Sequence, residues 1–296
     1  NVSLTTSCPT FPRRASLSHG SQIMLKTILI TGSTDGIGLA TARMLVSMGH
    51  HVLLHGRNAA KLEGVENTLS GLADDGIVES YAADLSRMVD VEALAKAVAD
   101  RHTRLDVLIN NAGVFKTADP VTPEGLDTRF AVNTLAPYLL TQQLLPLLGA
   151  TGRVINLSSA AQSPVNLESL AGRVRLSDDL DVYAQSKLAI TMWSHQMALA
   201  RKESGPIIVA VNPGSLLGTK MVREGFGMSG KDINIGAKIL VRAALDDEFE
   251  TASGQYFDND SGQFTSPHPD TQDPQKCEGV VRAIEAVLDN SRHFPS

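Results

Sequence analysis

From Lys26 onward, short apolar runs alternate with longer amphipathic stretches, and this alternation restricts the possible folds more than any other feature of the chain. Most of the apolar runs are rich in Val, Ile and Leu without polar alternation, which is typical of strands buried on both faces. They predict strands at Thr27 to Thr31, His51 to His55, Ile77 to Ala82, Leu105 to Asn110, Arg153 to Leu157 and Ile207 to Val211. The stretches between them predict helices that include Gly38 to Met48, Ala59 to Leu72, Val91 to His102, Thr134 to Leu148 and Tyr183 to Lys202. Because helices that alternate with strands cover both faces of a parallel sheet, we predict an α/β fold with a doubly wound parallel sheet of Rossmann type.

The length of the chain suits one large domain, which we place at residues 24–296. The 296 residues are 43% hydrophobic, ample for a sizeable core, and no internal repeat or long low-complexity tract divides them. Residues 1–23 lack acidic side chains and are rich in Ser and Thr, so they are either a targeting remnant or an artificial extension with Met24 as the natural start. After Pro213 we expect a substrate loop at about residues 215–235, a final strand and a closing helix.

Charge and composition exclude several classes of partner. A formal net charge of -6 and a pI near 5.7 argue against binding to nucleic acid or to anionic membranes. No apolar run approaches the roughly 18 residues of a membrane-spanning helix, so we expect a soluble, cytoplasmic protein. Cys8 and Cys277 lie far apart, which favours a reducing compartment and leaves one disulfide open. No His, Cys and Asp cluster has the short spacing of a local metal site, and no metal is predicted.

A glycine-rich segment joins the first predicted strand to the first predicted helix. Glycines at such a turn let the backbone approach a pyrophosphate, and the helix N-terminus presents N–H groups and its positive dipole end to the anion. An ordinary tight turn would use similar residues, but the position at the first strand-to-helix junction favours dinucleotide binding. The candidate cofactor-binding residues of this loop are Thr31, Gly32, Ser33, Asp35, Gly36, Ile37 and Gly38.

The end of the second predicted strand bears on the choice of cofactor. A basic residue there favours the 2′-phosphate of NADP(H), whereas an acid favours the free 2′-hydroxyl of NAD(H). The sequence offers Gly56 and Arg57 and no carboxylate, so NADP(H) is preferred and NAD(H) stays possible. Alternatively, Arg57 is a solvated loop residue, and the charge of Asp35 near the same phosphates weighs against the assignment.

Two later segments are also candidates for contacts with the nucleotide. Asp84 and Leu85 follow the third strand and can frame the adenine, unless Asp84 only caps the next helix. Asn111, Ala112 and Gly113 follow the fourth strand and suit a crevice against a nucleotide, although a plain turn would use the same residues.

Tyr183 and Lys187 are the strongest candidates for the chemistry. Four positions apart on a predicted helix, they project from one face and can interact. A free Tyr has a pKa near 10, and a neighbouring ammonium together with an oxidised nicotinamide ring can lower it enough for proton exchange. A single Tyr-x-x-x-Lys pair also arises by chance on protein surfaces.

Ser158, Ser159 and Asn133 strengthen this interpretation. A hydroxyl beside the Tyr phenol would hold the substrate oxygen and stabilise developing charge. Asn133 is a poor helix former inside a predicted helix, so it calls for a reason beyond local structure. The alternatives are a surface or capping Asn and serines that only end a strand.

At these residues the chain resembles the short-chain dehydrogenase/reductase family in its single-domain form, over nearly everything from Lys26 to the last helix. The family motifs occur in order. They are T-G-x-x-x-G-x-G at Thr31 to Gly38, N-N-A-G at Asn110 to Gly113, the helix Asn133, Ser159, Y-x-x-x-K at Tyr183 and Lys187, and P-G at Pro213 and Gly214.

The resemblance implies a catalytic tetrad and its roles. Tyr183 would exchange the proton, Ser159 would orient the substrate oxygen, and Lys187 would bind the nicotinamide ribose and tune Tyr183. Asn133 would hold a water of the proton relay through a backbone carbonyl. Thr219 resembles the family residue that binds the nicotinamide carboxamide, and Pro213 and Gly214 belong to the same cofactor-binding segment.

One departure suggests a branch of the family. The interval from Ser159 to Tyr183 is about twice the dozen or so positions typical of the family. With the segment from Gly254 to Phe257, it resembles the retinol dehydrogenase and carbonyl reductase branch, which implies a small apolar substrate. The inserted loop is alternatively a surface elaboration.

The function that we predict is hydride transfer between NADP(H) and the carbonyl or alcohol carbon of a small molecule, with Tyr183 as general acid or base. The alternatives are a nucleotide-sensing regulatory module on the same fold and a sugar-nucleotide epimerase, whose relatives carry a larger C-terminal domain. The helix surfaces resemble those that pair family members, so a homodimer or homotetramer is possible.

Overall fold

The six predicted strands are all present in the computed structural model, which describes residues 24–72, 76–202 and 204–291. They form one eight-stranded sheet with two further short strands, in the order β3-β2-β1-β4-β5-β6-β7-β8. The strands are β1 (Thr27–Ile30), β2 (His51–Gly56), β3 (Val78–Ala82), β4 (Val107–Asn110), β5 (Arg153–Leu157), β6 (Ile207–Asn212), β7 (Tyr256–Asp258) and β8 (Gln263–Thr265). Every neighbouring pair is parallel except β7 and β8. The predicted extension at residues 1–23 lies outside the described residues.

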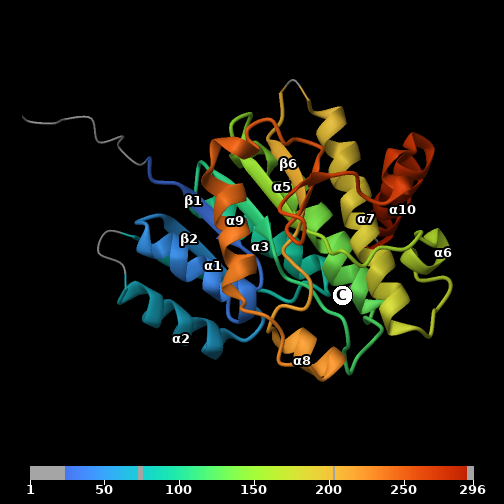
Figure 1. The fold of residues 1–296 in the computed structure, drawn as a ribbon, viewed down its shortest axis with the longest axis horizontal. Helices are drawn as coiled ribbons and strands as arrows, with labels where there is room; N and C mark the ends of the chain where they lie inside the picture. The colour runs from blue at the N-terminus through green and yellow to red at the C-terminus, as the bar shows by residue number, and fades with distance from the viewer. Residues whose placement is uncertain (1–23, 73–75, 203, 292–296) are drawn as a thin grey trace, which may run out of the picture.

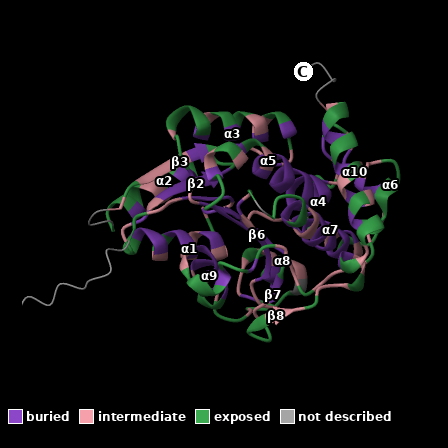
Figure 2. Ribbon diagram, turned by 90° about the horizontal axis from the view of Figure 1, so that it is seen from above, coloured by how far each residue is buried: buried purple, intermediate pink, exposed green. Residues whose placement is uncertain are grey.

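Helices cover both faces of this sheet, which confirms the doubly wound α/β fold (Figure 1). The longer helices are α1 (Gly36–Ser47), α2 (Ala59–Ser70), α3 (Met88–Arg101), α5 (Ala136–Leu148), α7 (Asp179–Ala200), α9 (Asn234–Leu245) and α10 (Pro274–Ser291). The shorter ones are α4 (Thr128–Phe130), the π-helical η1 (Ala131–Leu135), α6 (Leu167–Leu170), α8 (Lys220–Phe226), and the 3₁₀ turns η2 (Asp247–Phe249) and η3 (Pro269–Gln272). In Figure 2, α1 and α9 lie on one side of the sheet, and α3, α5 and α7 lie on the other.

Two hydrophobic cores lie on opposite faces of the sheet and share its strands. Leu29 of β1 belongs to the core beneath α3, α5, α7 and α10, whereas Ile28 and Ile30 belong to the core beneath α1 and α9. Because successive side chains of a strand point to opposite faces, a strand that serves two cores is apolar at every position. This explains why the inner predicted strands lack polar alternation, whereas β3 at the edge of the sheet carries Glu79 and Ser80.

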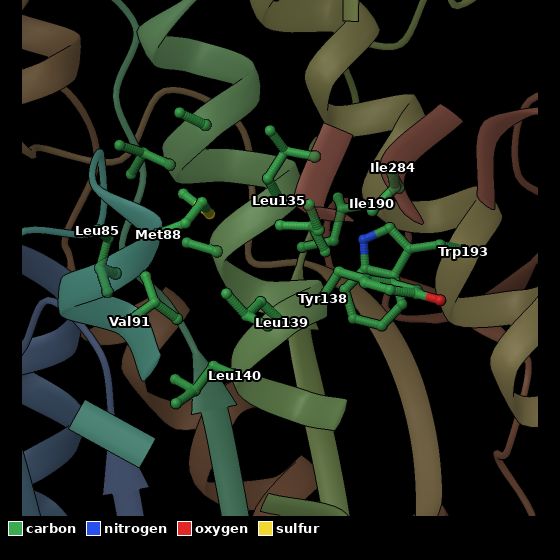
Figure 3. Packing of buried hydrophobic residues seen from close by; sticks show 14 of the residues in the cluster. Leu85, Met88, Val91, Leu135, Tyr138, Leu139, Leu140, Ile190, Trp193 and Ile284 are labelled. Carbon is green, nitrogen blue, oxygen red and sulfur yellow. The ribbon is translucent and has the colours of Figure 1, made fainter. Parts of the chain in front are cut away.

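Helix α7 is fixed between the sheet and α10 by a buried aromatic pair. The rings of Tyr138 on α5 and Trp193 on α7 meet edge to face, with centroids 5.4 Å apart, and Ile284 of α10 packs beside them (Figure 3). The Tyr138 hydroxyl donates to Glu285 of α10 at 2.8 Å. These contacts hold the helix that carries Tyr183 and Lys187 in a defined position on the sheet.

The structure adds elements that the apolar pattern does not predict. Strands β7 and β8 have three residues each, too few to produce a recognisable periodicity, and only one final strand was expected. Helix α7 begins at Asp179, four residues before the predicted start, because the Asp178 carboxylate accepts hydrogen bonds from Leu180 N and Asp181 N. Within the described ranges, no helix combines the length and the apolar character that crossing a bilayer requires.

Candidate active site

A cavity of about 730 Å³ opens at the carboxyl ends of the parallel strands, a size that is ordinary for a small-molecule or cofactor site. In open α/β sheets, ligands bind at this edge, where the strand order reverses. Here the reversal lies between β1 and β4, and the loops that follow these two strands both line the cavity. The fold therefore presents one crevice for a ligand at the expected position.

The glycine loop after β1 is packed tightly against the loop after β4. Gly32 has a φ of +65°, and a Cβ on it would lie 2.9 Å from the Cα of Ala112. The Thr31 hydroxyl accepts hydrogen bonds from Asn111 N at 3.0 Å and from Ala112 N at 3.1 Å. The Asn111 amide donates in return to Thr31 O at 2.9 Å and to Gly32 O at 3.1 Å. Thr31 and Asn111 thus fix the shape of the crevice by joining its two loops.

His55 of β2 supports the same loop. Its Nδ1 accepts a hydrogen bond from Gly32 N at 3.1 Å, and its Nε2 donates to Ala83 O at 3.1 Å. Burial lowers the pKa of His55 to about 4, so the ring is neutral and can keep this pair of bonds. Ser33 is fully buried and bonds to the backbone of His55, so it acts within the loop framework rather than in the cavity lining.

Positive charge gathers at the end of the cavity nearest to β2. Arg57 and Lys61 both line it, and Lys61 Nζ donates to the Asp35 carboxylate at 3.1 Å. Partial burial raises the pKa of Asp35, but the hydrogen bonds from Lys61 and Gly36 N outweigh it and lower the pKa overall. The carboxylate of Asp35 is therefore engaged by the N-terminus of α1 and by Lys61, and its charge near the predicted phosphates is compensated.

The residues around this crevice fit an anionic dinucleotide. Four cationic side chains, Arg57, Lys61, Lys187 and Lys220, line the cavity against two carboxylates, those of Asp35 and Asp84. The N-terminus of α1 also faces it, since Gly36 and Ile37 belong to the lining. Asp84 is not the N-cap of α3, which is Arg87.

Tyr183 and Lys187 both face the cavity from α7. The Lys187 Nζ lies 5.8 Å from the centroid of the Tyr183 ring and donates to Leu157 O at 2.7 Å. Burial lowers the pKa of Lys187 to about 8, because little of the ammonium group is hydrated. Burial raises the pKa of the Tyr183 phenol, while a hydrogen bond with the Ser159 hydroxyl lowers it in part.

The two neighbouring serines have different surroundings. The Ser158 hydroxyl is turned into α7, where it donates to Lys187 O at 3.2 Å and pairs with the Thr191 hydroxyl at 2.6 Å. Ser159 is the serine whose hydroxyl interacts with Tyr183. The Tyr256 hydroxyl of β7 donates to Ser159 O at 3.1 Å, which holds the backbone of Ser159 in place.

Asn133 lies in the π-helical segment η1 and is fully buried. Its side-chain oxygen accepts from Val114 N at 2.8 Å, and its amide donates to Val114 O at 2.9 Å and to the Ser186 hydroxyl at 3.0 Å. Single-turn π segments inside helices occur frequently at functional sites. Asn133 therefore connects the loop after β4 with α7. Its contact on α7, Ser186, lies three residues after Tyr183.

The segment after β6 covers the remaining side of the cavity. Leu216 has a φ of +55°, a conformation that is strained for a branched residue, and it lines the cavity. Thr219 caps α8 through its hydroxyl, which accepts from Val222 N at 3.2 Å, and its methyl carbon would contact a Cβ placed on Gly36 at 3.6 Å. Helix α8 lies so close to Phe115 that a Cβ on Gly225 would come within 2.7 Å of the ring.

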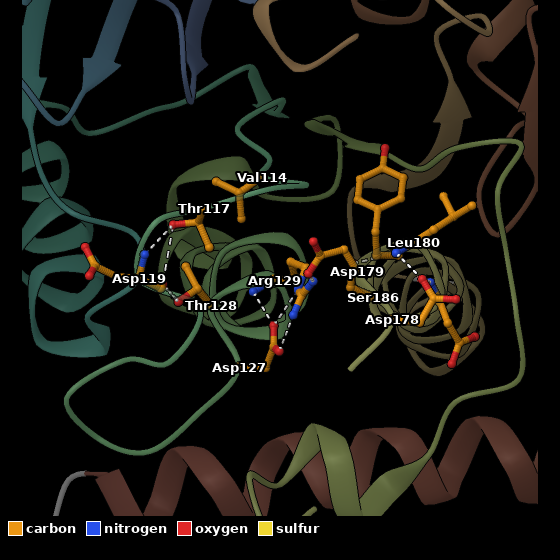
Figure 4. Close-up of polar contacts among 12 residues, drawn as sticks. Val114, Thr117, Asp119, Asp127, Thr128, Arg129, Asp178, Asp179, Leu180 and Ser186 are labelled. Atoms are coloured by element: carbon orange, nitrogen blue, oxygen red, sulfur yellow. Dashed lines mark hydrogen bonds and ion pairs between the residues drawn. The ribbon is translucent and has the colours of Figure 1, made fainter. Parts of the chain in front are cut away.

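A buried guanidinium joins the two helical segments that carry Asn133 and Tyr183. Arg129 of α4 is 3% exposed, donates to Asp127 at 2.9 and 2.7 Å, and bonds to Asp179 in the first turn of α7. Figure 4 shows Arg129 between these two carboxylates. This contact was not predictable from the pattern of residues, because Arg129 and Asp179 are 50 positions apart along the chain.

Most of the predicted site residues line one cavity. They are Gly32, Asp35, Gly36, Ile37, Arg57, Asp84, Leu85, Asn111, Ala112, Gly113, Ser159, Tyr183, Lys187, Pro213, Gly214 and Thr219. Thr31, Ser33, Gly38 and Asn133 are buried behind this lining. The lining residues that sequence reasoning missed include Lys61, His55 and Phe115, of which only Lys61 carried a signal, since it lies one turn into the helix after Arg57.

A cationic crevice at this edge of the sheet, with a buried Lys187 beside the partly buried Tyr183 and Ser159, is typical of nucleotide-dependent enzymes built on a Rossmann-type sheet. Comparison with known proteins gives the family within this class: the model of the short chain dehydrogenase family matches residues 26–230. The chain belongs to the short-chain dehydrogenase family.

Individual relatives agree with this membership. Retinol dehydrogenase 13 of Mus musculus is 30% identical over 268 residues, which cover 84% of this chain and 80% of the relative. Retinol dehydrogenase 12 of Mus musculus is 32% identical over 249 residues, with coverage of 80% and 78%. These relatives confirm the predicted retinol dehydrogenase branch.

Solved structures share the fold. An uncharacterised protein from Mycobacterium paratuberculosis superimposes with a TM-score of 0.75 at 27% identity, covering 89% of this chain and 93% of that one. A short chain dehydrogenase from Burkholderia cenocepacia, solved in complex with NADP, gives a TM-score of 0.64 at 25% identity, covering 80% and 97%.

Proposed function

We propose that this member of the family transfers a hydride between NADP(H) and the carbonyl or alcohol carbon of a small apolar molecule. The observation that carries the proposal is the approach of Ser159 and Lys187 to the Tyr183 ring inside one cationic crevice. The nicotinamide cofactor, when bound, supplies the hydride acceptor or donor. The residues of the chain bind it, orient the substrate oxygen and move a proton.

Tyr183 is the proposed proton donor in reduction and the acceptor in oxidation. Without a charged ligand, burial raises the pKa of its phenol, which favours the protonated form that reduction needs. The Lys187 ammonium stands 5.8 Å from the ring centroid and stabilises the phenolate that forms when the proton leaves. Ser159 is proposed to hold the substrate oxygen beside the phenol.

Two cations support the preference for NADP(H). Arg57 and Lys61 line the cavity beyond the end of β2, where the 2′-phosphate of the adenosine ribose would lie. The loop between β2 and α2 consists of Arg57 and Asn58 and contains no acidic residue. Asp35 already pairs with Lys61, so its carboxylate competes with the phosphate for that lysine. Among the residues that the structure describes, no carboxylate forms an ion pair with Arg57, and Arg57 is the proposed main contact of the 2′-phosphate.

Apolar side chains support the substrate class. Val114, Phe115, Leu180, Leu216 and Met221 line the same cavity as Tyr183. The Phe115 and Tyr183 rings meet edge to face with centroids 5.3 Å apart. The proposed substrate loop, residues 215–235, supplies two of these five residues. Such a wall favours an apolar aldehyde or ketone over a charged one.

The proposed function is tested by following NADPH and NADH oxidation with a panel of aldehydes, ketones and quinones. We expect turnover of apolar carbonyl compounds, faster with NADPH. Failure of every carbonyl compound with both cofactors, despite cofactor binding, would contradict the proposal.

Ser159→Ala and Ser158→Ala form a matched pair for the same assay. Ser159→Ala removes the hydroxyl beside Tyr183, and we expect kcat to fall by about 10² or more, the range for an oxyanion-type contact. Ser158→Ala removes a hydroxyl that bonds to α7, and a smaller loss is expected. An equal fall in kcat for both variants would contradict a specific role of Ser159.

A further inference from the structure

A cluster of two histidines and a glutamate lies outside the active site, at the amino-terminal ends of the strands. His51 opens β2, Glu79 is the second residue of β3, and His102 follows α3. One ligand atom from each lies within 4.8 Å of the others. The cavity described above opens at the opposite ends of these strands, so the cluster takes no part in the proposed reaction.

Both imidazoles approach the carboxylate through the same type of atom. His51 Nε2 lies 2.8 Å from Glu79 Oε1, and His102 Nε2 lies 3.3 Å from Glu79 Oε2. The two rings are edge to face, with centroids 5.3 Å apart. The two Nε2 atoms thus lie on the same carboxylate, one beside each oxygen, and all three groups are close enough to share one metal ion.

We propose that His51, Glu79 and His102 bind one divalent transition-metal ion of the Zn²⁺ class. Two imidazoles and one carboxylate form a ligand set that zinc accepts, with solvent in the fourth position. With bonds near 2.1 Å in tetrahedral geometry, the ligand atoms stand roughly 3.4 Å apart. Small rotations of the three partly exposed side chains bring them from the present separations to that spacing.

Two neighbouring side chains, Arg101 and Tyr81, contact the proposed ligands and affect the affinity for a metal ion. Arg101 holds Glu79 Oε2 at 3.0 Å, but its side chain is 59% exposed, so it can turn into solvent when a cation takes its place. The Tyr81 hydroxyl lies 3.0 Å from Glu79 Oε2 and 3.1 Å from His102 Nε2, which places it beside two of the ligands. Both neighbours therefore compete with the metal: Arg101 has to release Glu79 Oε2, and the Tyr81 hydroxyl has to release His102 Nε2.

The spacing of the sequence could not reveal this site. The ligands come from three separate elements, which the sheet and the end of α3 bring together. A bound ion would tie the starts of β2 and β3 to the end of α3. We expect it to raise the melting temperature without changing cofactor binding.

The test uses the tag-free full chain, stripped with a chelator, and Co²⁺ alone as a spectroscopic probe, followed by competition with Zn²⁺. We expect one Co²⁺ per chain with visible d–d absorption that Zn²⁺ removes. His51→Gln and His102→Gln should each weaken the affinity by at least about tenfold. His268→Gln, which changes another partly exposed histidine beside a carboxylate, should leave it unchanged.

Arg101→Gln provides a test in the opposite direction that does not depend on losing a ligand. Removing the competing cation should tighten Co²⁺ binding in a chain whose circular dichroism matches the wild type. The proposal is overturned if the wild type shows no d–d absorption, if His51→Gln and His102→Gln bind as the wild type does, or if Arg101→Gln weakens binding.

Discussion

Lys187 is a buried lysine, with only 4% of the residue exposed to solvent. Burial lowers its pKa from 10.5 to about 8, so between these values the unfolded chain binds a proton that the folded chain has released. Stability therefore rises with pH across this window, by up to about 3 kcal/mol from this group. Below pH 8 both states carry the charge, and the folded state bears the full cost of burying it.

Lys187→Met should abolish this rise. The free energy of unfolding of the wild type and of Lys187→Met is measured by urea denaturation without cofactor, from about pH 7 to about pH 10. As the pH rises, we expect the wild type to gain stability relative to Lys187→Met. Lys96→Met, at an exposed position on α3, is the control and should follow the wild type. A difference that stays constant with pH contradicts a depressed pKa for Lys187.

Single residues were predictable from the sequence where spacing alone sets their neighbours. Tyr183 and Lys187 share a helix face, so their four-residue spacing predicted their approach. His55 was not predictable as a site residue, because its partner Gly32 lies in a separate segment of the chain.

At the scale of elements, Arg129 couples α4 to the start of α7. Arg129→Met leaves the half-buried carboxylate of Asp127 without its cation and should lower the unfolding free energy by about 3 kcal/mol, as expected when one partner of a buried pair is removed. Asp179→Asn, at a half-exposed residue, should cost about 1 kcal/mol or less. Urea denaturation of both variants gives the comparison, and a loss for Arg129→Met no larger than that for Asp179→Asn would contradict a dominant role of the Arg129–Asp127 pair.

The strands were predictable from the sequence where an apolar run forms part of the buried sheet. β1, β2, β4, β5 and β6 carry enough consecutive Val, Ile and Leu to be recognised, whereas the edge strand β3 is more polar. The π segment η1 follows from hydrogen bonding of the backbone within a buried helix, and α8 from a capping Thr in the loop. Neither leaves an apolar period, so the detailed shape of the cavity was not predictable.

For the whole molecule, cofactor binding should appear as stabilisation against unfolding. A ligand at 100 times its Kd adds about 2.7 kcal/mol when it binds only the folded state. At equal concentrations we expect NADP⁺ to raise the melting temperature more than NAD⁺, and Arg57→Gln to reduce this difference. Arg282→Gln, an exposed arginine on α10, serves as the control. An equal rise in melting temperature with NADP⁺ and NAD⁺ in the wild type would contradict the preference for NADP⁺ that we infer from Arg57.

The global fold was predictable because one pattern repeats along the chain: a buried strand, then a covering helix. The position of the crevice followed from the fold, since the reversal of strand order fixes it. The identity of the substrate was not predictable, because side chains from separate loops, among them Phe115 and Leu216, form its wall.

The central claim is that Tyr183 carries the proton in a reaction driven by the bound cofactor, and Tyr183→Phe tests it most directly. The measurement is the single-turnover rate of NADPH oxidation with the best carbonyl substrate, together with the Kd of NADPH. The account predicts a rate lower by at least about 10² with a Kd within about twofold of the wild type. Retention of the wild-type rate by Tyr183→Phe would contradict it.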